Sequence, residues 1–116
     1  MKIKVLFLAL SACFVSTAYA QDTESYPSKP ITLIVSASPG GTTDLAARMI
    51  AEPLGKALGQ TIVVENKPGA AGSIAAQQLI KSRADGYTLL LQYSGFQVIT
   101  PSITKVNWDP VKDFKP

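Results

Sequence analysis

Residues 31–44 read ITLIVSASPGGTTD, and this stretch decides the fold class of the chain. The first five residues, Ile31–Val35, are β-branched or apolar almost throughout, which is typical of a strand buried on both faces of a parallel sheet. A loop with two adjacent glycines follows at residues 36–43. From residue 44 to residue 58 the apolar residues recur with helical spacing, so the sequence predicts a strand, a loop and a helix in succession.

The predicted first helix has signals at both ends and one break inside. Thr42 or Thr43 can cap its start, and the acid Asp44 suits the positive end of the helix dipole. Gly59 suits its C-terminal end. Pro53 lies inside the helix and lacks a backbone N–H, so we expect it to kink the helix or split it in two.

The same alternation continues along the chain. A second β-rich run, a second helical pattern and a third apolar run follow at residues 61–64, 71–81 and 87–91. The order strand, helix, strand, helix, strand is the pattern of a right-handed parallel α/β unit. Residues 97–103 are compatible with a short helix that Pro101 interrupts, and residues 106–116 predict no regular element.

Two loops of this unit have the composition of an anion-binding site. In an open parallel sheet, ligands bind outside the carboxyl ends of the strands, where loops lead into helices. The loop at residues 36–44 contains Gly40 and Gly41, which let a ligand approach the backbone, and it ends in two threonine hydroxyls. The loop at residues 66–73 repeats this design. Because free amides at helix N-termini attract anions, the two loops together suit one carboxylate.

The alternative is that both loops are ordinary turns, since glycine is common where a strand leads into a helix. Neither loop has the Gly-Lys-Ser/Thr ending of a P-loop or the G-x-G-x-x-G of a dinucleotide site, so nucleotide binding is not predicted. Asp44 is interpreted as an acid that serves the helix dipole. Arg48 and Lys67 are interpreted as solvated, with a role in binding as the alternative. The aromatic residues Trp108 and Tyr93 are expected to pack in the core rather than line a cleft.

The first 20 residues predict export. Lys2 and Lys4 precede an apolar run, and Ala18-Tyr19-Ala20 forms an A-x-A cleavage site. Cleavage after Ala20 leaves residues 21–30 as a short polar leader and predicts a periplasmic protein. In a competing interpretation Cys13 becomes a lipidated first residue on a membrane surface. Cleavage before Cys13 would leave the signal with an unusually short apolar core and would not explain the A-x-A sequence.

The composition argues against several classes of function. The 116 residues carry a formal charge of +3, and loss of the export signal leaves the charges nearly balanced, so no concentrated basic face is expected for nucleic acid. The chain contains no histidine, and its one cysteine lies in the signal. Its serines therefore have no histidine to activate them, and no disulfide can be proposed. We predict a binding protein, with no catalytic residue, metal or cofactor.

Several motifs occur in a fixed order from Tyr26 to the last residue. They are YPxKPI at 26–31, PGGxxD at 39–44 with AR at 47–48, LGQxxVVENxxGAxG at 58–72, DGYTL at 85–89 and DPxKDF at 109–114. Together they resemble the solute-binding proteins of tripartite tricarboxylate transporters, also called the Bug family. Each motif is modest alone, but their joint order and spacing is specific.

The resemblance implies a periplasmic binding protein of the type II class, whose two domains close on a ligand like a flytrap. It implies capture of a small carboxylate or related anion for a membrane permease. Family members are much longer, so residues 31–116 are expected to be the N-terminal part of the first domain. One wall of such a site is expected to bind its solute weakly or not at all. A truncated remnant without function, and a small exported enzyme, remain as alternatives.

The resemblance also implies particular binding residues. By motif, the two ligand loops of the family correspond to residues 37–43 and 69–73, and a serine after the third strand is a further candidate. Residues 36–38 depart from the more usual proline-containing start of the first loop, which leaves the ligand preference open. The candidate ligand-binding residues are Ala37, Gly40, Gly41, Thr42, Thr43, Gly69, Ala70, Gly72, Ser73 and Ser94.

Overall fold

The structure, a computed structural model, describes residues 25–115. The predicted export signal, its cleavage after Ala20 and the alternative at Cys13 all lie outside the described residues. No helix within residues 25–115 is long and apolar enough to cross a membrane.

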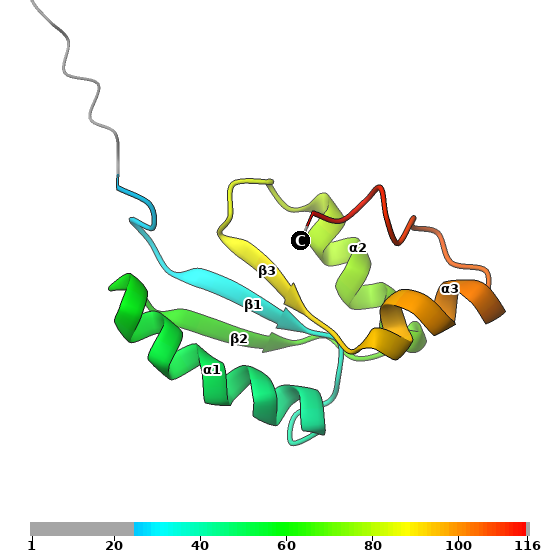
Figure 1. The fold of residues 1–116 in the computed structure, drawn as a ribbon, viewed down its shortest axis with the longest axis horizontal. Coiled ribbons are helices and arrows are strands. Elements are labelled where there is room, and N and C mark those ends of the chain that lie inside the picture. Colours follow the sequence, from blue (N-terminus) through cyan, green and yellow to red (C-terminus); the bar gives the residue numbers. More distant parts are fainter. Residues whose placement is uncertain (1–24, 116) are drawn as a thin grey trace, which may run out of the picture.

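Three parallel strands form one sheet in the order β2-β1-β3, as Figure 1 shows. They are β1 (Ile31–Val35), β2 (Ile62–Asn66) and β3 (Thr88–Leu91). The central strand β1 is the apolar run of the sequence, and four of its five residues are buried. The predicted parallel α/β unit is therefore confirmed.

The two main helices are α1 (Thr42–Leu58) and α2 (Ser73–Lys81). Alternate residues of β1, namely Ile31, Leu33 and Val35, form one core cluster with Ala47 of α1. Because β2 and β3 lie on opposite sides of β1, right-handed crossovers place α1 and α2 on opposite faces of the sheet. The sheet is therefore the middle layer of three.

Of the two outcomes expected at Pro53, a kink or a split, the split is wrong, because α1 is one helix from Thr42 to Leu58. Pro53 is exposed, and the side chain of Met49, one turn earlier, is 79% exposed. The carbonyl of Met49 loses its intrahelical donor on the solvent side, where water can replace it. The helix ends as predicted at Gly59, which has a left-handed φ of 65°.

The segment after β3 is helical over a longer range than predicted. A π-helical turn, η2 (Gly95–Ile99), leads directly into α3 (Thr100–Ile103). Pro101 is the second residue of α3, and the helix continues past it to Ile103, so the proline does not interrupt it. Residues 106–115 contain no helix or strand, as expected.

A second core cluster lies between α2 and the segment that follows α3. It contains Phe96, Trp108 and Ala76. The rings of Phe96 and Trp108 are stacked with centroids 4.8 Å apart, and Phe114 meets Trp108 edge-on at 5.5 Å. Trp108 is 5% exposed, so it packs in the core as predicted, whereas the same prediction for Tyr93 is wrong, since it is 56% exposed.

Residues 25–30, the described part of the predicted leader, are irregular but attached to the sheet. The hydroxyl of Tyr26 donates to the carbonyl of Gly86 at 2.7 Å, and the amide of Ser28 donates to the hydroxyl of Tyr87 at 2.8 Å. The two tyrosine rings are 5.1 Å apart. These contacts lie beside the start of β3, at the opposite end of the strands from the predicted loops.

Candidate functional site

The three loops that carry the predicted site residues leave the sheet at one edge. Val35, the last residue of β1, is in register with Asn66 of β2 and with Leu91 of β3. The carboxyl ends of all three strands therefore lie together, and α1, α2 and η2 begin beside them (Figure 1). Of the ten candidate ligand-binding residues, five follow β1, four follow β2, and Ser94 follows β3. This is the edge at which open parallel sheets bind ligands.

The first loop reaches α1 through two glycines with different roles. Gly40 has a left-handed φ of 79°. Gly41 has an ordinary φ of −73°, but a Cβ atom there would lie 3.1 Å from the carbonyl oxygen of Ser38. Gly40 is therefore required for its backbone conformation, whereas Gly41 is restricted by space.

The predicted threonine cap is wrong. The N-cap residue is Gly41, and no side chain caps the helix there, so Thr42 and Thr43 already belong to its first turn. A carboxylate oxygen of Asp44 instead accepts the amide of Gly40 at 2.8 Å. The loop backbone is thus held from inside the helix, and the first-turn amides of α1 have no intrahelical acceptor.

Asp44 is the centre of a buried polar network. It is 2% exposed and accepts hydrogen bonds from Nε of Arg48 at 3.1 Å and from Nδ2 of Asn66 at 2.9 Å, as well as from Gly40. These hydrogen bonds, with that of Arg48 the strongest, lower the pKa of Asp44 from 3.8 to about 2. The interpretation as a dipole acid is therefore incomplete, because the ionised carboxylate also fixes the loop.

Asn66 connects the two loops, a role that the sequence pattern did not reveal. It is the last residue of β2, and its Nδ2 atom also donates to the carbonyl of Ala37 at 3.0 Å. Its Oδ1 atom accepts from Arg48 at 3.3 Å. The spacing of Asp44 and Arg48 is a signal for an i,i+4 pair, but no local pattern indicates that a residue 22 positions later completes the network.

The two cations near the loops are paired within the described residues. Arg48 is bound to Asp44 and Asn66, so it braces the first loop. Lys67 lies 3.5 Å from a carboxylate oxygen of Glu65, and the side chains of both are 39% exposed. The amide of Lys67 continues the sheet by donating to the carbonyl of Val35 at 2.8 Å.

The second loop has an unusual backbone. Four consecutive residues have positive φ: Gly69 at 116°, Ala70 at 46°, Ala71 at 49° and Gly72 at 84°. Ala70–Gly72 form a short turn, η1, so α2 begins at Ser73 rather than at residue 71 as predicted. A left-handed conformation costs an alanine about 1–2 kcal/mol. Strain of this kind is concentrated at ligand sites and switch regions.

The aromatic cluster of Phe96 and Trp108 packs against this second loop. A Cβ atom at Gly72 would lie 2.2 Å from the ring of Phe96, so the loop backbone lies directly on that ring. The next residue, Ser73, accepts a hydrogen bond from Nε1 of Trp108 at 3.2 Å. The strained turn is therefore held by residues that are distant in the sequence.

Two further polar groups lie at the same edge. The hydroxyl of Ser36, after β1, and Oε1 of Gln92, after β3, are buried and have no hydrogen-bond partner within residues 25–115. Ser94, two residues after Gln92, is exposed at the start of η2. Sequence reasoning placed Ser94 at this edge through the family motif but did not identify Gln92.

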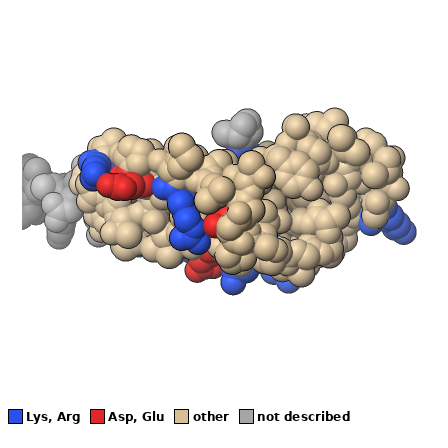
Figure 2. Space-filling model, turned by 90° about the horizontal axis from the view of Figure 1, so that it is seen from below, with Lys and Arg blue, Asp and Glu red and all other residues tan. Residues whose placement is uncertain are grey.

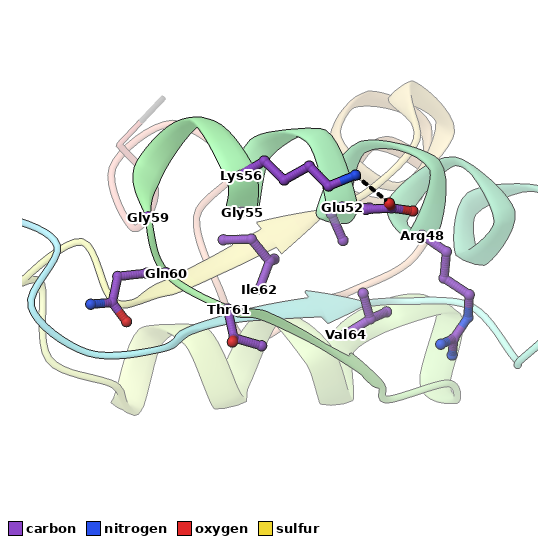
Figure 3. Close-up of a pocket in the computed structure, with 10 residues that line it drawn as sticks. Arg48, Glu52, Gly55, Lys56, Gly59, Gln60, Thr61, Ile62 and Val64 are labelled. Atoms are coloured by element: carbon purple, nitrogen blue, oxygen red, sulfur yellow. Dashed lines mark hydrogen bonds and ion pairs between the residues drawn. The ribbon is translucent and has the colours of Figure 1, made fainter.

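A groove lies elsewhere, between α1 and the outer edge of β2 (Figure 3). It has a volume of about 640 Å³ and is lined in part by Arg48, Gly55, Gln60 and Val64. An exposed ion pair between Lys56 and Glu52, at 2.6 Å, lies along it. The groove is open and contains none of the ten candidate residues, so it is separate from the loop edge.

Charge is spread thinly over the part of the molecule that the structure describes. On the face shown in Figure 2, basic side chains lie beside acidic ones and most of the surface is uncharged. Among residues 25–115, no three histidine, cysteine or acidic residues are grouped so that they could hold a metal ion.

Comparisons with known proteins identify the family of the chain. The family model described as "Tripartite tricarboxylate transporter family receptor" matches residues 46–116. A UPF0065 protein of Bordetella bronchiseptica is 42% identical over 116 residues, which cover 97% of this chain and 34% of that protein. The protein BugT of Bordetella pertussis is 46% identical over 90 residues, which cover 75% of this chain and 28% of BugT. The chain thus spans about a third of the length of these relatives.

Two solved structures share the fold. The periplasmic binding protein BugD superimposes with a TM-score of 0.74 at 40% identity, over 78% of this chain and 30% of BugD. MatC from Rhodopseudomonas palustris, with bound malate, also gives a TM-score of 0.74, at 36% identity, over 78% of this chain and 31% of MatC. The fold is that of a periplasmic binding protein. The chain therefore belongs to the family of tripartite tricarboxylate transporter receptors.

Proposed function

We propose that this chain supplies the part of a solute-binding receptor that holds one carboxylate of a small anionic solute. The carboxylate lies between the β1–α1 loop and the β2–α2 loop and accepts hydrogen bonds from backbone amides and from the hydroxyls of Thr42, Thr43 and Ser73. The observation that carries the proposal is the bond of Asn66 to both Asp44 and the carbonyl of Ala37, which holds the two loops together at the ligand edge of the sheet.

The charges at this edge favour an anion. Two helices begin there, α1 with 17 residues and α2 with 9, and each directs the positive end of its dipole toward the loops. The first-turn amides of α1 have no intrahelical acceptor, whereas those of Gly72 and Ser73 are bonded to carbonyls of their own turn. The buried carboxylate of Asp44 is already surrounded by donors from Gly40, Arg48 and Asn66. Its negative charge is balanced by Arg48, so it leaves the helix dipoles available to the solute.

The relatives support a class of solute. The family description names a tricarboxylate transporter receptor, and the relative MatC is described with bound malate. A site made of backbone amides recognises a carboxylate but not the rest of the molecule. We therefore assign a small carboxylate or related anion, with the solute's other end left to contacts outside these loops.

The proposed partner is the membrane permease of a tripartite transporter, and the proposed location is the periplasm, as for the relative BugD. Binding rather than catalysis fits a chain that has no histidine. The chain spans about a third of the length of its relatives. We also propose that the whole receptor encloses the solute and delivers it to the permease.

Thermal unfolding with and without solute tests this function. A ligand that binds only the folded state raises the melting temperature in a concentration-dependent way. Malate should stabilise the chain, whereas malamide, which has the same skeleton without carboxylates, should not. Equal effects of malate and malamide, or no effect of malate at any concentration, would contradict carboxylate binding.

A further inference from the structure

The segment after α3 crosses the start of α2 and contacts it through polar side chains. Nε1 of Trp108 donates to Oγ of Ser73 at 3.2 Å, although the two residues are 35 positions apart. One turn further along α2, Nε2 of Gln77 donates to Oδ1 of Asn107 at 3.0 Å. Ser73 is the first residue of α2, so this contact reaches the second candidate ligand loop.

The indole contact restricts what the Ser73 hydroxyl can do. An indole N–H is a donor and never an acceptor, so the oxygen of Ser73 must be the acceptor in this bond. A serine hydroxyl has one proton and two lone pairs. With a lone pair committed to Trp108, its proton remains available for another acceptor, and a carboxylate accepts hydrogen bonds without donating any.

The ring of Trp108 adds a second connection to the same loop. It stacks on Phe96 with an angle of 18° between the ring planes, and Gly72 lies so close to Phe96 that no side chain fits between them. The strained residues of the turn, Ala70 and Ala71, directly precede Gly72. Trp108 therefore supports the loop through the ring stack and orients its last hydroxyl through the N–H.

We propose that Trp108 is a positioning residue for solute binding: its indole N–H holds the Ser73 hydroxyl as an acceptor on the protein side, so that the hydroxyl proton is donated to the solute carboxylate. This inference rests on the proposed function. Trp108 then affects the affinity for the solute through the Ser73 oxygen atom, an effect that the burial of Trp108 alone does not predict.

The bond itself is tested without any solute. Trp108 is the only tryptophan of the chain, so the ¹⁵N-labelled protein has a single indole N–H resonance. We expect Ser73→Ala to shift this resonance and to speed its exchange with water, and Ser73→Thr, which keeps the hydroxyl, to restore the wild-type behaviour. An indole resonance that is the same in the wild type and in Ser73→Ala would overturn the proposal.

The effect on binding is tested by titration of malate into the full chain, followed by chemical shifts of the loop amides, which detect weak binding. Trp108→Phe keeps a stacked ring but removes the donor, and should weaken malate binding about three- to tenfold. Ser73→Ala should have a similar effect. The double variant should be no weaker than Ser73→Ala alone, because both changes remove one interaction. Phe114→Leu, which alters the packing of Trp108 but not its N–H, should change the affinity by less than about twofold.

The outcomes separate this proposal from the proposed function. One outcome is that malate shifts the resonances of the loop amides while the affinity losses of Trp108→Phe and Ser73→Ala multiply in the double variant. In that case Trp108 acts only through packing, and the inference is wrong. If malate moves no loop amide, the proposed function fails and the role of Ser73 toward the solute fails with it. If Trp108→Phe does not fold, the comparison of Ser73→Ala with Ser73→Thr decides, since restored affinity in Ser73→Thr supports the hydroxyl and equal losses contradict it.

Discussion

Asn66 and Asp44 are joined by a hydrogen bond of 2.9 Å between Nδ2 and Oδ1, which links the end of β2 to the first turn of α1. The same Nδ2 atom lies 3.0 Å from the carbonyl oxygen of Ala37. One side-chain amide therefore fixes the first loop at two points and attaches it to the strand that leads into the second loop. We expect the site to depend on this residue more than its partial exposure suggests.

Replacement of Asn66 should disturb both stability and binding. Asn66→Ala removes both donated hydrogen bonds and leaves Asp44 with fewer donors, so we expect the melting temperature to fall by about 5 °C. The malate affinity should fall as well, because the loops lose their connection. Asn107→Ala is the matched control, since its partner Gln77 lies outside the loops. Equal losses of malate affinity in the two variants would show that Asn66 has no special role.

The buried carboxylate predicts a loss of stability in acid. The pKa of Asp44 is lowered from 3.8 to about 2 in the folded chain, chiefly by the hydrogen bond of Arg48. The unfolded state therefore takes up the proton first, and the stabilisation is complete above about pH 4 to 5 and is lost as the pH falls toward about 2.

Urea unfolding at several pH values measures this loss. Asp44→Asn should be less stable than the wild type at neutral pH and should lose less stability in acid. Some acid sensitivity should remain, because the amides of Lys112 and Val111 also lower the pKa of Asp109. If Asp44→Asn and the wild type lost the same stability between about pH 5 and pH 2, the network would not depend on the charge.

Gly72 should tolerate a methyl group much less than another left-handed glycine does. In Gly72→Ala the new Cβ atom meets the Phe96 ring at 2.2 Å and the residue keeps a φ of 84°, so overpacking adds to the backbone cost. We expect a loss of about 3 kcal/mol or more in the free energy of unfolding. Gly59→Ala is the control, since Gly59 has a φ of 65° with open space around it and should lose only about 1–2 kcal/mol. Equal urea midpoints for the two variants would contradict the contact.

A substitution at Gly41 should lower the affinity for malate without disrupting the fold. Its φ of −73° and ψ of 165° are extended backbone that any residue adopts, so Gly41→Val should keep the fold with a small adjustment near the carbonyl of Ser38. The added side chain should block approach to the loop amides and lower the malate affinity tenfold or more, about 1.4 kcal/mol. Lys67→Ala should lower it less, because the amides provide the main contact with the anion. Unchanged affinity in Gly41→Val would mean that the loop is only a turn.

The sequence predicted the sheet well because its signals are local. The apolar run at Ile31–Val35 is a buried central strand, and the order of elements led to the parallel topology. The same order of elements placed the two loops at the carboxyl edge, and the family motifs added Ser94 as a candidate. The start of α2 was missed because Ala70 and Ala71 favour a right-handed helix, and only their surroundings impose positive φ. The role of Asn66 was missed because its partners are 22 and 29 residues away.

The most direct test of the central claim is a map of the malate-binding surface by ¹⁵N chemical shifts on the full chain, with malamide as the control. We expect malate-dependent shifts concentrated in the amides of residues 40–43 and 69–73, with smaller shifts near Ser94, and none of these with malamide. Shifts concentrated instead at Gly55, Gly59 and Gln60, in the groove between α1 and β2, would contradict it, because binding would then occur away from the carboxyl ends of the strands.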